Sequence, residues 1–477
     1  MCGLGGDLFT LIHLADQNRV EALNATGRAP AMASIDFFRD QGLEAMPEDG
    51  LRSATVPGAV DGWEVMLSRF GTMTLDRLAT KAIDFAEYGF PVYEELRQAI
   101  IEKRDLLAGS ADAAAIFLPN GQPPRLGQRL RQPDLAESIK LVASQGRSVF
   151  YQGRLGRALV DFSEQSGGWF TEQDLARHTG NWCEPIRTQY RDYEICTQPP
   201  NSQGIALLMQ AGILEKFDLA GLPPFSADLV HLMVEARKLA FADRDRYVCD
   251  PDFHPIPVDR MLSNDHAQDQ ALRIDSRKAA GKVDARSFTK GGEDTVYLAV
   301  VDREGNAISM IQSIFQAFGS GLIIPGTGIM LHNRGCGFSL DPDHLNRLAP
   351  HKRPYHTLHP AMILKDGQPQ IVLGSPGADG QTQTVIQLAV NMLEYGASAQ
   401  EAVEAPRWRG NPDGTLLMEN RFPSETIAGL KDRGHKVEVL SDWHPIMGSA
   451  QAIMIDRTHQ VLMGGADPRR QAYAIGA

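Results

Sequence analysis

Hydrophobic positions along the chain follow two different periods. In several segments apolar residues recur every three or four positions, which places them on one face of a helix. These predicted helices span about 75–88, 135–142, 227–241, 382–394 and 424–433. Gly89, Gly396 and Gly434 follow three of them and predict where those helices end, and Ser424 is predicted to open the last.

Short aliphatic and β-branched runs predict strands instead. They lie at 8–12, 296–301, 307–311, 371–373, 437–439, 452–455 and 460–463. The residues 302–306 between two of these runs include Gly305 and predict a hairpin connection. The part before residue 290 is therefore predicted to be rich in helices and the remainder rich in strands. The polar, glycine-bearing residues 291–294 are predicted to form a flexible linker at this border.

Composition and charge narrow the function classes. The 477 residues contain 47 Lys and Arg against 59 Asp and Glu, which gives a net charge of −12 and disfavours nucleic-acid binding. No apolar run reaches the roughly 18 residues of a membrane span. Five scattered cysteines suit neither a disulfide framework nor a metal site, so they are predicted to be free thiols in a reducing compartment. We therefore expect a cytoplasmic protein without nucleic-acid or membrane partners, with a periplasmic location as the alternative.

The border between the two parts is a candidate chemical site. Gly291 and Gly292 precede Asp294 and Thr295, directly before a predicted strand. The simplest interpretation is a loop that enters a strand. However, a threonine at a new N-terminus carries its own base, because its α-amine has a reference pKa of about 7.7–8.0 and can accept the hydroxyl proton. Cleavage before Thr295 would create that nucleophile, and the glycines would allow the necessary backbone distortion.

Two neighbouring features strengthen this hypothesis. Ser313 lies on the next strand of the predicted hairpin, where it could stand beside Thr295 as a second hydroxyl. The glycine-rich turn at 374–380 leads into a predicted helix, and free N–H groups at such a turn suit an oxyanion hole or an anion site. The turn lacks the Lys-Ser/Thr pair of a phosphate-binding P-loop, which argues against nucleotide binding.

Many short motifs together resemble the γ-glutamyltransferase (γ-glutamyltranspeptidase) family of N-terminal-nucleophile hydrolases. They include the Gln-Pro-Pro-Asn-Ser-Gln-Gly run, the Asp-Thr pair and the Gly-Ser-Pro-Gly run. In the order that the family has, the matching stretches are 56–58, 70–73, 150–153, 167–168, 198–204, 235–244, 250–253, 294–295, 302–309, 318–321, 325–330, 352–354, 374–377 and 466–469. They cover essentially the whole chain.

The resemblance implies an α+β fold, a four-layer αββα sandwich, made as a precursor that cuts itself between Asp294 and Thr295. The large chain would be 1–294 and the small chain 295–477, interleaved in one domain. Thr295 would be the nucleophile and Ser313 the second hydroxyl beside it. The N–H groups of Gly377 and Ala378 would form the oxyanion hole. Alanine in place of the family's second glycine is tolerable there if its φ is negative, since only the N–H is used. No metal or other cofactor is expected.

Three departures from the best-known members concern substrate binding. The family's arginine that grips the substrate α-carboxylate aligns with Thr26, and Arg28, two residues later, is the candidate replacement. The family's paired serines that bind the same carboxylate are His356 and Thr357 here. These four positions indicate a carboxylate pocket with a different set of contacts.

The third departure removes an acidic group. Gly337 stands where the family has the acid that contacts the substrate α-ammonium, and this loses a charge-assisted hydrogen bond worth about 1.5–3 kcal/mol. Arg334 adds positive charge nearby, so the pocket is predicted to suit an anionic group. The predicted function is a family amidohydrolase or acyltransferase that cleaves γ-glutamyl or similar carboxylate-bearing small amides through a Thr acyl-enzyme.

Alternatives remain open at this stage. The Asn-Arg-Gly run at 333–335 resembles the branch with cephalosporin-acylase-like and oxamate-amidohydrolase-like members, which predicts no γ-glutamyl activity. An inactive, unprocessed relative is a second alternative. A metallohydrolase is a third, because five histidines lie within 332–359, namely His332, His344, His351, His356 and His359. They lack a recognisable ligand spacing and are predicted to be solvated loop residues.

The predicted partners are a small-molecule amide and the chain's own second cleavage product, in a heterodimer that could dimerise further. In the family, a glycine-rich run like that at 3–6 follows a helical segment and a strand. We therefore expect the large chain to be shorter at its start than in the family.

Overall fold

The computed structural model describes residues 2–281 and 294–476, which separate into two compact units. Unit 1 contains Met1–Leu8, Asn24–Asn181 and Gln312–Pro354, and unit 2 contains Phe9–Leu23, Trp182–Ile311 and Tyr355–Ala477. Each unit is thus assembled from three separate stretches of chain. The predicted division into 1–294 and 295–477 depends on cleavage and remains a prediction.

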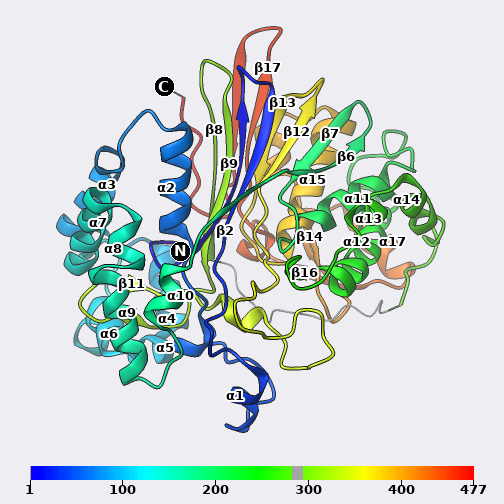
Figure 1. The fold of residues 1–477 in the computed structure, drawn as a ribbon. Coiled ribbons are helices and arrows are strands. Elements are labelled where there is room, and N and C mark those ends of the chain that lie inside the picture. Colours follow the sequence, from blue (N-terminus) through cyan, green and yellow to red (C-terminus); the bar gives the residue numbers. More distant parts are fainter. Residues whose placement is uncertain (1, 282–293, 477) are drawn as a thin grey trace. The chain divides into compact units, whose positions relative to one another are not determined.

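Unit 1 is mainly helical (Figure 1, blue to cyan). Its helices are α1 (Ile35–Arg39), α2 (Ala59–Phe70), α3 (Leu75–Tyr88), α4 (Glu94–Glu102), α5 (Arg104–Ala108), α6 (Ala111–Phe117), α7 (Pro133–Gln145), α8 (Arg147–Tyr151), α9 (Arg154–Gln165) and α10 (Glu172–Ala176). Helices α3 and α7 pack together, and α8 packs against α2, α7 and α9. Gly89, with φ +83°, ends α3 where the sequence predicted.

Short strands of unit 1 form two small pairs. These are β3 (Phe90–Pro91) with β4 (Arg129–Leu130), and β10 (Ile323–Ile324) with β11 (Ile329–Met330). A buried cluster that includes Phe38, Phe150 and Trp169 is the main apolar core of this unit.

Unit 2 combines a sheet with helices α11 (Gly204–Leu214), α12 (Ala227–Tyr247), α13 (Val258–Met261), α14 (Asn264–Ala271), α15 (Gly380–Tyr395), α16 (Ala399–Glu404) and α17 (Ser424–Asp432). Its six-stranded sheet has the order β18 (Val461–Ala466), β17 (Gln451–Asp456), β13 (Gln368–Gly374), β12 (Ala361–Lys365), β7 (Tyr193–Thr197), β6 (Ile186–Tyr190). A small sheet adds β14 (Trp408–Gly410), β15 (Thr415–Glu419) and β16 (Lys436–Leu440).

A five-stranded sheet has the order β5 (Asn181–Cys183), β2 (Arg19–Ala25), β1 (Asp7–Leu14), β9 (Ala307–Phe315), β8 (Asp294–Val301). Strands β1, β2, β5 and β9 each run from one unit into the other. The connection between β8 and β9 is the predicted hairpin, with Gly305 at φ +86°.

The central strands β12 and β13 of the six-stranded sheet are buried on both faces, which their alternating side chains show directly. Ile363 and Leu373 point into the core that α11 and α15 cover, whereas Met362, Leu364 and Val372 pack with Leu11, Val20 and Ala307 from the five-stranded sheet. Successive residues of a strand face opposite sides of the sheet. The same strand therefore contributes side chains both to the core under the helices and to the core between the two sheets. Within unit 2 the order of layers is therefore helices, sheet, sheet. The predicted α+β class is confirmed.

Two details differ from the sequence prediction. Pro423, not Ser424, occupies the position before α17, and no side chain caps that end. The part before residue 290 also contains β2, β5, β6 and β7, which the pattern missed. Strand β6 carries Arg187, Thr188 and Gln189 at the edge of its sheet, so its apolar alternation is weak. Across the two described ranges, no helix combines the length and apolarity needed to cross a membrane.

Candidate active site

Thr295 is the second residue of β8 and is half-buried. Asp294 belongs to the same strand, while Gly291 and Gly292 lie outside the described residues. Thr295 and Tyr297 share one face of β8, because side chains two apart in a strand point the same way. This geometry makes Tyr297 an indicator of where Thr295 faces.

The Tyr297 ring lies directly on the backbone of Gly374. A Cβ built on Gly374 would come within 2.3 Å of the ring, so only glycine fits there. The Tyr297 hydroxyl hydrogen-bonds the Ser309 hydroxyl of β9 at 2.9 Å, which fixes the ring. Gly374 ends β13 and begins the glycine-rich turn. Thr295 therefore lies on the face of β8 that turns toward β13 and this turn.

The turn at 374–380 holds the two predicted oxyanion-hole residues in unusual backbone conformations. Gly377 has φ +131°, and Ala378 has φ +47°. The condition of a negative φ, under which alanine would be tolerable at this position, is not met. That conformation costs a residue with a Cβ about 1–2 kcal/mol, and such strain is common at functional sites.

The carbonyl groups of this turn are engaged, whereas its two central N–H groups are not. The Gly377 and Ala378 carbonyls accept hydrogen bonds from the N–H groups of Gly380 at 2.7 Å and Gln381 at 3.1 Å. Among the residues that the structure describes, neither the Gly377 N–H nor the Ala378 N–H has a hydrogen-bond partner. Two adjacent donors of this kind are what an oxyanion hole requires.

Gln203, at the start of α11, ties this turn to the chain around Thr357. Its Nε2 donates to the Thr357 carbonyl at 2.6 Å and to the Ala378 carbonyl at 2.9 Å. Its Oε1 accepts from Arg244 Nη1 at 3.0 Å and from the Tyr355 hydroxyl at 2.9 Å. Every polar atom of this buried amide is used, so its orientation is fixed.

Arg244 holds the side-chain amide of Gln203 in place through the hydrogen bond to its Oε1. It is buried and pairs with Asp245 at 2.7 Å and Asp379 at 3.2 Å. Burial alone lowers the pKa of Arg244, but the two carboxylates outweigh it and raise that pKa. Burial raises the pKa of Asp245 to about 6, against the opposing effect of Arg244. The turn at 377–378 is thus supported by a buried ionic network rather than by apolar packing alone.

His356 and Thr357, the predicted carboxylate contacts, lie beside Gln203 in unit 2. The His356 backbone donates to the Asn201 carbonyl at 2.9 Å and accepts from the Gln203 N–H at 2.8 Å. The His356 ring packs edge-on against Phe9, and its Nδ1 accepts the Leu358 N–H at 3.2 Å. The neutral ring therefore carries its proton on Nε2, where it can act as a donor.

Ser313 and Arg334, both in unit 1, each contact Phe315. The Ser313 hydroxyl accepts the Phe315 N–H at 2.7 Å, and the buried Arg334 guanidinium stacks on the Phe315 ring with 3.9 Å from Cζ to the ring centre. Phe315 has φ +76°, a strained conformation for an aromatic residue. Since Thr295 belongs to unit 2, its predicted proximity to Ser313 remains a prediction.

The segment before Arg334 holds it in place. His332 Nδ1 accepts the Arg334 N–H at 3.1 Å while its Nε2 donates to the Thr55 carbonyl at 2.9 Å. Burial lowers the pKa of His332, which keeps the ring neutral. Asn333 donates to Gln316 Oε1 at 2.8 Å. Arg334 is therefore a preorganised cation.

The other predicted substrate positions also fall in unit 1. Arg28 is half-buried, and its carbonyl accepts the Val56 N–H at 3.1 Å. Thr26, which aligns with the family arginine, is buried and donates its hydroxyl to Asn24 Oδ1 at 2.7 Å. Gly337 is buried in a short 3₁₀ turn, so this position offers no carboxylate.

The five histidines of 332–359 do not form a metal site in the described part of the chain. The cluster of potential ligands found there is His231, Glu235 and His435 instead. The prediction that the five are solvated is wrong, because His332, His344, His356 and His359 are buried. Three of them, His332, His344 and His356, form hydrogen bonds between a ring nitrogen and a nearby backbone group. Such bonds satisfy the polar ring atoms, so these loop histidines can be buried.

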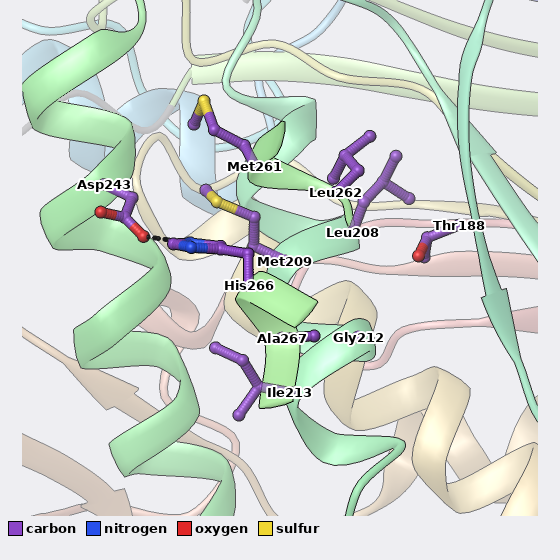
Figure 2. A pocket seen from close by; sticks show the side chains of 10 residues that line it. All are labelled: Thr188, Leu208, Met209, Gly212, Ile213, Asp243, Met261, Leu262, His266 and Ala267. Carbon is purple, nitrogen blue, oxygen red and sulfur yellow. Dashed lines mark hydrogen bonds and ion pairs between the residues drawn. The ribbon is translucent and has the colours of Figure 1, made fainter. Parts of the chain in front are cut away.

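A small pocket of unit 2 contains none of the predicted site residues. It is lined by Thr188, Leu208, Met209, Gly212, Ile213, Asp243, Met261, Leu262, His266 and Ala267. Figure 2 shows its apolar side chains around the His266–Asp243 pair, which is joined at 2.8 Å. This pair lies on α12 and α14, so it belongs to helix packing and not to the turn at 374–380.

Sequence reasoning gave no role to Gln203, Arg244, Tyr355 and Phe315. Gln203 and Arg244 fall within stretches that match the family, 198–204 and 235–244, and this was their only signal. Apart from Asp245, which directly follows Arg244, their side-chain partners lie 41–175 residues away, so no local pattern could reveal the network.

Similarity to known proteins covers the whole chain. A family model described as Gamma-glutamyltranspeptidase matches residues 1–477. The Glutathione hydrolase-like YwrD proenzyme of Bacillus subtilis is 40% identical over 482 residues, with 100% of this chain and 90% of that protein covered. The Oxamate amidohydrolase proenzyme of Klebsiella pneumoniae is 37% identical, with the same coverage of 100% and 90%.

The fold is similar to that of a solved enzyme. The crystal structure of cephalosporin acylase from Bacillus halodurans aligns with a TM-score of 0.91 and 33% identity, covering 100% of this chain and 88% of that chain. Both the sequence and the backbone therefore match along their full shared length.

Proposed function

This chain belongs to the gamma-glutamyltranspeptidase family of N-terminal-nucleophile hydrolases, and we propose that it cleaves small amides bearing a carboxylate through an acyl-enzyme on Thr295. The observation that carries this proposal is the turn at 377–378. Its two N–H groups, which have no hydrogen-bond partner among the described residues, lie next to β13, on the side toward which the Thr295 face of β8 turns. A nucleophile and an oxyanion site would then share one region of unit 2.

Maturation is the first step of the proposal. Cleavage of the Asp294–Thr295 bond gives chains 1–294 and 295–477, which stay together as a heterodimer. The similar proteins from Bacillus subtilis and Klebsiella pneumoniae are named proenzymes, which supports this step. Since strands of both predicted chains share one sheet, with β9 beside β1 and β8 beside β9, separation after cleavage would break that sheet.

Catalysis follows from the new N-terminus. The α-amine of Thr295 takes the proton from its own hydroxyl as Oγ attacks the amide carbonyl carbon. The N–H groups of Gly377 and Ala378 stabilise the oxyanion, and the C–N bond breaks as the α-ammonium returns the proton to the leaving amine. Water then attacks the ester by the reverse steps, which releases the acid and regenerates Thr295. Ser313 is proposed to stand beside the nucleophile.

Substrate choice is proposed to depend on Arg334. This guanidinium is buried, stacked on Phe315 and held through His332, so it can offer two parallel donors to a carboxylate at little entropic cost. Gly337 supplies no acid for a substrate ammonium. Arg28, His356 and Thr357 are proposed as further contacts. An oxamate-like or glutaryl-type amide fits this set better than a γ-glutamyl compound.

A substrate panel tests the proposal. Oxamate, a glutaryl amide, glutathione and γ-glutamyl-p-nitroanilide should be compared with a neutral amide of the same size. Arg334→Met should lower kcat/KM for the carboxylate substrates by about 10–150-fold, which corresponds to a lost charge-assisted bond of 1.5–3 kcal/mol. The rate on the neutral amide should stay unchanged. Arg52→Met, in which another arginine stacked on a phenyl ring is removed, is the matched control.

Two results would contradict the proposed substrate class. Efficient hydrolysis of γ-glutamyl-p-nitroanilide, with no activity on oxamate or the glutaryl amide, which lack an ammonium, would show that the enzyme is specific for γ-glutamyl compounds. An equal loss on charged and neutral amides in Arg334→Met would mean that Arg334 has a structural role only. We also propose a reducing, cytoplasmic location, because none of the described cysteines, Cys2, Cys183, Cys196, Cys249 and Cys336, forms a disulfide.

A further inference from the structure

A buried cluster in unit 2, far in sequence from Thr295, contains three potential metal ligands. His231 and Glu235 lie four residues apart on α12, so they share one face of that helix. His435 lies between α17 and β16. All three side chains are buried, and one ligand atom from each lies within 4.8 Å of the other two.

The two rings already point at a common position. His231 Nδ1 and His435 Nε2 lie 2.8 Å apart, and His231 Nε2 lies 2.8 Å from the Asp275 carbonyl. A carbonyl only accepts, so Nε2 of His231 carries the proton and its Nδ1 offers a lone pair. The ring of His435 then donates the shared proton. Burial lowers the pKa of His231, and it lowers that of His435 to about 3, so both rings are neutral.

We propose that His231, Glu235 and His435 bind a divalent transition-metal ion, with Zn²⁺ as the best fit. The ion takes the place of the proton between the two rings, with ligands His231 Nδ1, His435 Nε2 and a Glu235 carboxylate oxygen. His435 moves its proton from Nε2 to Nδ1, so no proton is lost. Two imidazoles and one carboxylate form a donor set that zinc uses, with a fourth position left for water.

The surroundings include the supporting contact that such sites have. The Asp275 carbonyl holds His231 in the tautomer that ligates through Nδ1, which is the usual role of a group behind a metal-bound histidine. Glu235 Oε1 lies 3.9 Å from His435 Nε2. Zinc ligands at about 2.0–2.1 Å require the two nitrogens to separate by a few tenths of an ångström. Small ring shifts supply that distance.

Two neighbouring cations, Lys238 and Arg433, oppose the ion, and Lys238 provides a test. Lys238 Nζ contacts Glu235 Oε1 at 2.7 Å and the Ala280 carbonyl at 2.9 Å, so it competes with a metal for the carboxylate. Glu235 Oε2 accepts the Ala280 N–H at 3.1 Å. A bound ion would join α12, the segment at 275–280 and the residue before β16. The role is structural and separate from amide cleavage, which uses no metal in the proposed mechanism.

Metal binding to the purified full chain tests this proposal. After chelator treatment and gel filtration, Zn²⁺ should bind at one equivalent per chain by isothermal titration and elemental analysis. It should also raise Tm, because a ligand that binds only the folded state stabilises it. Co²⁺ should give the visible spectrum of a four-coordinate site with nitrogen and oxygen ligands. His266→Gln, which removes a histidine paired with Asp243, is the matched control.

Two variants change affinity in opposite directions. Glu235→Gln keeps the side-chain shape and an acceptor for Ala280 N–H but should weaken Zn²⁺ binding at least tenfold. Lys238→Met removes the competing ammonium while it keeps most of the stem, and should tighten binding. Failure of wild type to bind stoichiometrically would overturn the proposal. So would equal affinity in wild type and Lys238→Met, or a Co²⁺ spectrum without tetrahedral features, whatever the amide activity.

Discussion

The amide of Gln203 is the contact on which the geometry of the turn at 377–378 depends most directly. Gln203→Met preserves length and volume but removes all four of its hydrogen bonds. The Thr357 carbonyl loses its 2.6 Å donor, and the Ala378 carbonyl keeps only the Gln381 N–H. One deprived buried acceptor costs about 1–3 kcal/mol and each weakened bond about 0.5–1.5 kcal/mol. With one deprived acceptor and three weakened bonds, we expect a loss of about 2.5–7.5 kcal/mol in the free energy of unfolding.

The same substitution should slow catalysis more than it weakens substrate binding. The Ala378 N–H would lose its fixed direction toward the oxyanion. Removal of one oxyanion donor typically lowers kcat by about 10²–10³-fold, and a misdirected donor should cost about 10–100-fold. The assay is urea unfolding at pH 7.5 together with kcat and KM on the best amide of the panel, with KM expected to change little.

Gln210→Met is the matched control, since it alters a buried glutamine within α11, the helix that Gln203 directly precedes. Gln210 makes one intrahelical bond, to the Ala206 carbonyl at 2.9 Å, and its Oε1 has no partner among residues 2–281 and 294–476. This variant should lose at most about 1 kcal/mol and keep its kcat. Equal kcat values for the two variants would refute the role given to Gln203.

Three further predictions follow from the same structure. Ala378→Gly removes the strain of a positive φ of +47° at a residue with a Cβ. Because about 1–2 kcal/mol of strain outweighs the added entropy of the unfolded chain, urea unfolding should show a gain of up to about 1 kcal/mol in the free energy of unfolding. A destabilised variant would contradict this. Burial lowers the pKa of His359 to about 3, below its unfolded value, so stability should fall as pH decreases from 6.5 toward 3. His359→Leu should remove up to about 3 kcal/mol of that loss between pH 7 and 4, measured by unfolding at each pH, and an unchanged pH profile would argue against it. Ser313→Ala leaves the Phe315 N–H without its 2.7 Å acceptor and should cost about 1–3 kcal/mol, with Ser313→Thr restoring stability; equal unfolding midpoints for Ser313→Ala and wild type would exclude this contact.

Local patterns predicted the elements well and the polar network poorly. Helix α3 and its end at Gly89, the hairpin around Gly305 and the turn before α15 each follow from a few neighbouring residues. Their period and their glycines are local properties, so one sequence suffices to predict them. Strand β6 was missed because its edge position allows polar residues on both faces.

The candidate site shows the opposite case. Thr295, Gly377 and Ala378 were predicted from motifs, but the conformation of Ala378 was not, because it depends on how the chain enters α15. The clamp by Gln203 depends on Thr357 and Ala378, which are 154 and 175 residues away. The burial of His359 likewise depends on tertiary packing. Contacts of this range leave no periodic signal in the chain.

Intact mass of the purified protein tests the central claim most directly. The account predicts two fragments, one ending at Asp294 and one beginning at Thr295, with covalent labelling of Thr295 by an acylating substrate. Thr295→Ala should give one uncut, inactive chain. A wild-type protein that remains one chain yet hydrolyses amides, or a Thr295→Ala protein that still cuts at this bond, would contradict the account.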